Sequence, residues 1–251
     1  MAFIYRCLQK VSAHEHHVNL NFFFHGRGTA LQKAPIGMFR SLLHQLFSKA
    51  HSVREPIRNA FREKMAFGEL RRDWEWQPKE LQELFFSAVT YVAETRVVTI
   101  IVDALDEAGP DIASSLVAYF HRLSDRLSGT GRAGRICISC RHHPVISAIP
   151  SLEIVVEREN GKDIATYVEN EVRSKIWIQE GDEDSIKARQ GLENAIAGQA
   201  SGLFQWACLV TWMAVERYIE TGSWSKARSL SELPKELSGL YRYILRKVIK
   251  D

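Results

Sequence analysis

The run VVTIIVDALDE, residues 97–107, constrains the fold more than any other stretch of the sequence. It opens with Val97–Val102, a continuous run of Val, Ile and Thr with no polar face, which is typical of a strand buried on both sides of a parallel sheet. Three carboxylates follow at once, on Asp103, Asp106 and Glu107. Open α/β sheets bind ligands beyond the carboxyl ends of their strands. The run therefore predicts an α/β protein with acidic residues at the ligand-binding edge of its sheet.

The three carboxylates have the chemistry of a metal site. Mg²⁺ takes oxygen ligands, and a carboxylate just beyond a strand can hold the ion against a substrate phosphate. An apolar strand that ends in this way is the pattern of a Walker B segment. Taken alone, the same residues also fit an ordinary strand that ends in a solvated acidic loop, and both interpretations stay open.

A second strand brings further polar side chains to the same edge. The segment Arg135–Cys140 is expected to be a strand, and a strand–helix–strand order implies a right-handed parallel crossover. Ser139 and Arg141 would then lie beside the carboxylates. The guanidinium fork of Arg141 suits phosphate oxygens, but an ion pair with Asp103 or Asp106 is an equally good interpretation.

The pair Cys137 and Cys140 forms a CxxC, with His142 and His143 just beyond. Residues three apart on a strand point to opposite faces of the sheet, so we do not expect the two thiols to share a metal ion.

Strands and helices alternate in the first part of the chain, and helices fill the rest. Strands are expected at 18–24, 97–102, 135–140 and 151–156, and helices at 1–13, 35–47, 81–92 and 116–127. Beyond Asp163 the pattern predicts helices alone, around 164–172, 192–196 and 203–219, with Pro234 opening a last one. We therefore expect an α/β core at 1–158 and an all-helical subdomain at 159–251.

Charge and hydropathy exclude some partners. The 251 residues carry 33 basic and 30 acidic side chains, a net charge of +3, which is too even a balance to favour nucleic acid. The longest apolar stretch, Leu203–Val215, is too short to span a bilayer, and the N-terminus lacks the features of a secretory signal. We expect a cytoplasmic protein with no membrane partner.

With the segments FFFHGRGTALQKAPIGMFRSLLHQL, GLFQWACLV and LPKELSGLYRYIL, the DALDE run resembles the NACHT domains of fungal STAND-type P-loop NTPases, which include a nephrocystin-like N-terminal NTPase region. The resemblance covers nearly the full length. It implies the parallel sheet of a P-loop NTPase followed by a helical subdomain. It also implies Mg²⁺ and ATP or GTP as cofactors, with Asp103 as the metal ligand and Asp106 and Glu107 as catalytic residues that orient water. Arg141, with Ser139 beside it, would reach the terminal phosphate.

The phosphate-binding motif GxxxxGK[ST] does not occur in the sequence. The resemblance implies that the sequence starts within the motif or just after it. The sheet would then lack its first strand, and nucleotide binding would be impaired. In the sheet that remains, Val18–Phe24, Val97–Val102 and Arg135–Cys140 should be neighbours in that order. The segment Ser151–Val156 should be poorly paired or displaced.

The function implied is that of a fragment of a nucleotide-dependent signalling switch, of the type associated with fungal non-self recognition. Its partners would be other protein domains of the same signalling system, and self-association is possible. The alternative is a catalytically inactive protein-interaction scaffold. An in-frame GxxxxGK[ST] upstream of Met1 would favour the switch.

Overall fold

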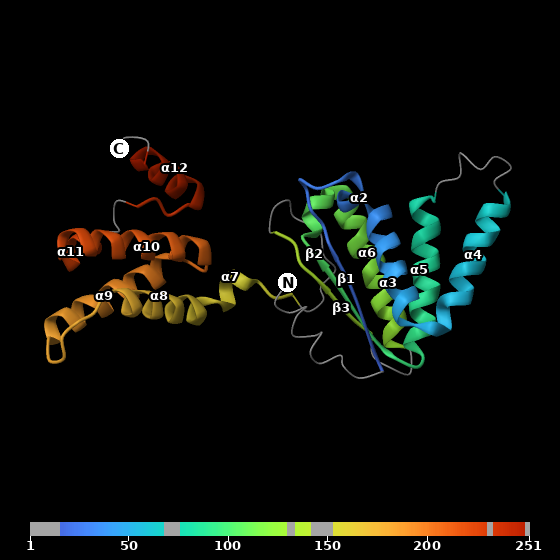
Figure 1. Ribbon diagram of the computed structural model, residues 1–251, viewed down its shortest axis with the longest axis horizontal. Coiled ribbons are helices and arrows are strands. Elements are labelled where there is room, and N and C mark those ends of the chain that lie inside the picture. The colour runs from blue at the N-terminus through green and yellow to red at the C-terminus, as the bar shows by residue number, and fades with distance from the viewer. Residues whose placement is uncertain (1–15, 68–75, 130–133, 142–152, 230–232, 249–251) are drawn as a thin grey trace. The chain divides into compact units, whose positions relative to one another are not determined.

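A computed structural model of the chain describes residues 16–67, 76–129, 134–141, 153–229 and 233–248 (Figure 1). Its contacts divide the chain into two compact units, Met1–Ser151 and Leu152–Asp251. The boundary predicted from the sequence, at 158, lies a few residues from this division, and helix α7, Val156–Glu159, packs on the following helix α8, Gly161–Lys175. The first unit is α/β and the second is helical.

Within the described residues, the sheet of the first unit has three parallel strands in the order β1-β2-β3, as predicted. The strands are β1 His17–Phe23, β2 Val97–Asp103 and β3 Arg135–Ile138. β2 is the central strand, and its side chains from Val98 to Val102 are all buried. The two flanking strands, β1 and β3, bury fewer of their side chains. The continuous apolar run therefore marks the central strand, as expected for a parallel sheet covered by other elements.

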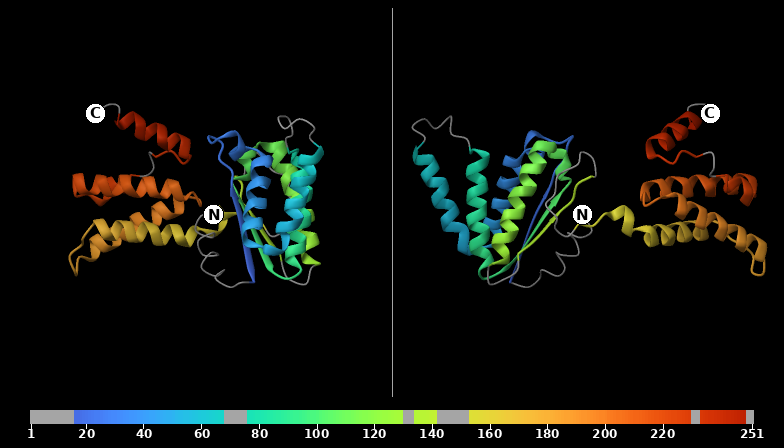
Figure 2. Two further views of the ribbon diagram at one scale, coloured as in Figure 1. Left: turned by 45° about the vertical axis from the view of Figure 1, so that its right-hand side comes forward. Right: turned by 180° about the vertical axis from the view of Figure 1, so that it is seen from behind.

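Helices cover one face of the sheet (Figures 1 and 2). The elements between the strands are α2 Ala30–Lys33, α3 Pro35–Lys49, η1 His51–Val53, α4 Arg54–Phe67, α5 Pro78–Ala93, η2 Leu105–Ala108 and α6 Pro110–Ser128. The covering helices, α3, α5 and α6, each begin with a proline, whose fixed φ suits the first helical position. Their apolar stripes pack on Val98, Ile100 and Val102 of β2, which form one core with them.

Among the described residues, neither the segment 151–156 nor the end predicted for β3 is a strand. Residues 153–155 belong to no strand and Val156 begins helix α7, so the described part of 151–156 is not a strand. This agrees with the expectation that the segment is poorly paired or displaced, for residues 153–156. A strand needs a neighbour for its ladder, and β3 pairs with β2 alone among the described strands. β3 also ends at Ile138, before the predicted Cys140, although the Ser139 N–H still donates to the Val102 carbonyl of β2. The predicted helix at 1–13 lies outside the described residues.

The second unit is built around α10, Phe204–Thr221, which contacts α8, α9, α11 and α12. The remaining bounds are α9 Glu183–Gln199, α11 Trp224–Ala227 and α12 Leu237–Val248. Trp206 is fully buried at the centre, and its indole Nε1 donates a hydrogen bond of 2.9 Å to the Pro234 carbonyl. That carbonyl is therefore turned to Trp206, and the last helix begins at Leu237 and not at Pro234. Among the described helices, none is both long and apolar enough to cross a membrane.

Candidate functional site

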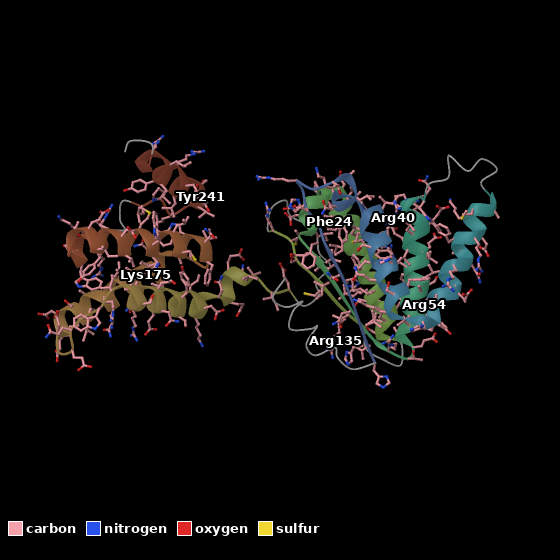
Figure 3. The ribbon with its side chains drawn as sticks, viewed as in Figure 1. Phe24, Arg40, Arg54, Arg135, Lys175 and Tyr241 are labelled. Carbon is pink, nitrogen blue, oxygen red and sulfur yellow. The ribbon has the colours of Figure 1, made fainter. Side chains whose placement is uncertain are left out.

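The residues proposed from the sequence meet at the carboxyl edge of the sheet. In Figure 3, Phe24, which follows β1, and Arg135, which begins β3, lie at opposite ends of the sheet. Asp103 closes β2 and pairs with Phe23 at the end where Phe24 lies. This is the edge at which open α/β sheets bind their ligands.

The chain makes a tight left-handed turn as it leaves β2. Ala104 has φ 53° and ψ 46°, a conformation that non-glycine residues seldom adopt because Cβ crowds the following carbonyl. This residue caps the short 3₁₀ helix η2, which carries Asp106 and Glu107. Strained residues of this kind cost on the order of 1–3 kcal/mol and persist where neighbouring groups hold them.

Ser139 is the group that holds this turn. Its hydroxyl donates to Asp103 Oδ1 and accepts a hydrogen bond of 3.1 Å from the Ala104 N–H. Its backbone extends the ladder, because the Ser139 N–H donates to Val102 O at 2.9 Å and its carbonyl accepts from Leu105 N at 2.9 Å. Ser139 therefore fixes the orientation of the Asp103 carboxylate. In this conformation its hydroxyl bonds within the turn, and the contact with a cofactor predicted from the sequence stays a prediction.

Arg141 joins the end of β3 to η2. Its backbone N–H donates to Asp106 Oδ1 at 3.1 Å, and its Nε lies 3.5 Å from Asp106 Oδ2. Its Nη2 donates to Glu107 Oε1 at 3.0 Å. The Asp106 side chain is only 6% exposed, whereas that of Arg141 is 74% exposed. Of the two interpretations left open for Arg141, this conformation shows the ion pair, made with Asp106 and Glu107.

Glu107 reaches a third element, the loop after β1. Its Oε2 accepts a hydrogen bond from the Gly26 N–H. This loop was not among the site residues predicted from the sequence, and its segment GRGT, residues 26–29, lacks the spacing and the lysine of a phosphate-binding loop. A signal was present, because Gly26 closely follows the carboxyl end of a strand that neighbours β2. The loops that follow parallel strands share one edge of the sheet.

The loop is closed on itself by short-range hydrogen bonds. The His25 N–H donates to Gln32 O at 3.1 Å, and the Gly28 N–H donates to His25 O at 2.8 Å. Thr29 and Gln32 form a capping box at the start of α2. A Cβ at Gly28 would lie 2.3 Å from Gln32 Oε1, so this position requires glycine while Gln32 keeps its place. The loop therefore presents the Gly26 N–H from a defined backbone.

The donor set fits Mg²⁺ only together with a phosphate. Among the described residues, no group of three or more His, Cys, Asp or Glu side chains is placed to hold a metal ion. Mg²⁺ that accompanies a nucleotide is bound through one or two carboxylates, waters and the substrate phosphates. Asp103, oriented by Ser139, fits the place of a single carboxylate ligand. Cys137 and Cys140 are exposed, and His142 and His143 lie outside the described residues.

Comparisons with known proteins bear on the first unit. A search of solved structures finds the structure of C. elegans PCH-2, with a TM-score of 0.31 and 11% sequence identity. The match covers 88% of this chain and 61% of that chain, and we draw no conclusion about fold or function from so low a TM-score. No curated protein matches the chain. Residues 1–141, more than half of the 251, match the family described as Nephrocystin 3, N-terminal. The chain therefore belongs to the Nephrocystin 3, N-terminal family.

Proposed function

We propose that the α/β unit is the nucleotide-responsive part of a STAND-type signalling switch, with the phosphates of ATP or GTP at the carboxyl edge of the sheet. The observation that carries the proposal is the contact of Arg141 with Asp106 and Glu107 beside Asp103. These residues follow two neighbouring strands and include both a phosphate-binding cation and carboxylates suited to Mg²⁺. Family membership supports the same class of protein.

Each residue has a role in this proposal. Asp103 would hold Mg²⁺, which neutralises charge on the phosphates when it is bound. Asp106 and Glu107 would orient the attacking water, and the Arg141 guanidinium would contact the terminal phosphate. Ser139 acts through Asp103, because its hydroxyl fixes that carboxylate before any ligand arrives. A preoriented carboxylate needs no rearrangement when charge develops, which is how such sites lower barriers.

The 251 residues by themselves should bind nucleotide weakly. In P-loop proteins the backbone amides and the lysine of GxxxxGK[ST] supply most phosphate contacts, and the printed sequence contains no such motif. Three carboxylates repel a triphosphate, and one arginine does not offset them. We expect this chain to bind Mg-ATP and Mg-GTP no better than about millimolar, roughly −4 kcal/mol, with no hydrolysis above background.

A second candidate is a scaffold for protein contacts that performs no catalysis. Protein groups already engage Asp103, Asp106 and Glu107 in this conformation. The helical unit also exposes large apolar side chains, with Trp177 at 82% and Ile219 at 62%. Aromatic side chains such as that of Trp177 are enriched in protein interfaces relative to the rest of a protein surface.

Isothermal titration with Mg-ATP and Mg-GTP separates the two candidates. The chain is compared with a version extended at its N-terminus by a strand and a GxxxxGK[ST] loop, and with the same extension carrying Ala in place of the motif lysine. The switch predicts micromolar binding by the first extension alone, and loss of that binding on Asp103→Ala. The exposed Ser115→Ala should leave it unchanged. Absence of binding by both extensions would favour the scaffold, and micromolar binding by the unextended chain would show that the phosphate site is misplaced.

A further inference from the structure

Glu107 lies between two loops that are far from each other in the sequence. Its Oε2 accepts from the Gly26 N–H, 81 residues away, and its Oε1 accepts from Arg141 Nη2, 34 residues away. One carboxylate thus joins the loop after β1 to the segment after β3, across the end of the central strand. Its side chain is 25% exposed, so water screens these contacts only in part.

Both partners of Glu107, Gly26 and Arg141, are fixed in place by other hydrogen bonds. Gly26 belongs to the loop closed by His25 and Gln32, and a Cβ at Gly26 would lie 3.0 Å from Glu107 Oε2, which leaves little space for a side chain. The Arg141 backbone is fixed by its hydrogen bond to Asp106. A change at either partner therefore changes the position of the carboxylate.

We infer that Glu107 is a positioning residue that couples Arg141 to the loop of residues 24–29. The inference rests on the proposed function and extends it to the regulation of the same site. A guanidinium has a fixed set of N–H donors, and Nη2 of Arg141 already serves Glu107. A phosphate that draws Nη2 away leaves Glu107 held by Gly26 alone. The loop after β1 then loosens, and occupation of the site is transmitted to an exposed segment of the surface.

The coupling is measured without ligand, as the amide exchange rate of Gly26 in the ¹⁵N-labelled full chain. Glu107→Ala removes the acceptor and should speed exchange about tenfold, as expected for loss of a hydrogen bond to a charged group. Arg141→Ala should speed it about threefold, because an exposed ion pair contributes less. The double variant should exchange no faster than Glu107→Ala. The control is Glu83→Ala, an exposed carboxylate on α5, which should leave Gly26 unchanged.

The outcomes separate coupling from general loosening. Unchanged Gly26 exchange in Arg141→Ala, or effects of the two substitutions that simply add, would overturn the inference. Inorganic pyrophosphate is then titrated into the wild-type chain. A shift of the Arg141 amide together with faster Gly26 exchange is expected, and the shift without faster exchange would refute the coupling. If the Arg141 amide does not shift at pyrophosphate concentrations well above the millimolar range expected for this chain, the proposed contact of Arg141 with phosphate fails, while the ligand-free variants still decide the coupling.

Discussion

The hydroxyl of Ser139, which follows β3, donates a hydrogen bond to the carboxylate of Asp103, which closes β2. Both residues were expected to contact cofactors directly. In the structure one of them supports the other, and the same hydroxyl also accepts the N–H of the strained Ala104. The carboxyl edge of this sheet is therefore held in shape by the residues that make it acidic and polar.

Substitution Ser139→Ala should destabilise the turn after β2. It removes one hydrogen bond to a carboxylate and leaves the Ala104 N–H without its acceptor, a loss of about 2 kcal/mol. Native-state amide exchange of the β2 amides gives the change in opening free energy. Ser115→Ala is the matched control, because that exposed hydroxyl bonds only within α6. An equal effect of the two substitutions would contradict the role assigned to Ser139.

Substitution Ala104→Gly should stabilise the α/β unit. Glycine adopts the left-handed conformation without the Cβ clash, and the gain, reduced by the greater entropy of the unfolded chain, is roughly 0.5–1 kcal/mol. Ala113→Gly, in the buried face of α6, should instead cost about 1 kcal/mol. Denaturant unfolding of both variants measures the change in the free energy of unfolding, which should be positive for Ala104→Gly and negative for Ala113→Gly. A loss of stability in Ala104→Gly would show that Cβ of Ala104 makes a contact that outweighs the strain.

The central strand and the covering helices could be predicted because each has a regular pattern of apolar residues in the sequence. The run at 97–102 has no polar face, and α3, α5 and α6 show apolar positions at helical spacing. The segment 151–156 has the composition of a strand, but a ladder needs a neighbouring strand. Its described residues, 153–156, pair with no strand, as expected for a segment predicted to be poorly paired or displaced. The start of α12 was predicted too early because the Pro234 carbonyl accepts a hydrogen bond from the indole of Trp206, which is far away in the sequence.

The edge at which the site residues lie follows from the parallel topology, but their partners do not. Contacts such as Glu107 with Gly26 join loops without periodicity, and their distance in the sequence gives no local signal. The left-handed turn at Ala104 was also hidden, because glycine and asparagine are the residues that normally mark it. Loop contacts of this kind depend on tertiary packing that no window of the sequence contains.

Substitution Tyr119→Phe should weaken the core without disturbing its packing. The buried Tyr119 hydroxyl donates to Gln82 O at 3.0 Å, and burial raises its pKa, so it stays a donor over the whole working pH range. The ring contact with Phe39, 5.1 Å between centroids, should be kept. We expect a loss of about 1 kcal/mol in the free energy of unfolding. Tyr91→Phe, at a half-exposed position on α5, should show no loss in the same titration.

Glu193 in α9 should make the helical unit sensitive to pH. Burial raises the pKa of this carboxyl above its ordinary 4.5, and the nearby guanidinium groups of Arg189 and Arg173 oppose that rise. Because the folded pKa is raised, the stability that the group contributes is complete below the unfolded pKa and is lost as pH rises through the folded pKa. Glu193→Gln cannot lose a proton, so its stability relative to wild type should increase from about pH 4 to pH 7.

Thermal unfolding of the two proteins across that range measures the effect, with Glu183→Gln as control. Glu183 is an exposed carboxylate of the same helix, with a side chain 80% exposed. Its substitution should leave the pH dependence of wild type unchanged. Parallel pH profiles for wild type and Glu193→Gln would refute the burial argument.

The register that pairs His17 with Val97 also governs the order of events during synthesis. At ribosomal rates of about 5–20 residues per second, β1 must wait roughly ten seconds for its partner strand to appear. Until then the strand that carries Val18 and Leu20 has no neighbouring strand to pair with. The helical unit has no such delay, because α8 with α9 and α10 with α11 are neighbours in the sequence. The sheet therefore completes its first strand pairing later in synthesis, relative to its own residues, than the helical unit pairs its helices.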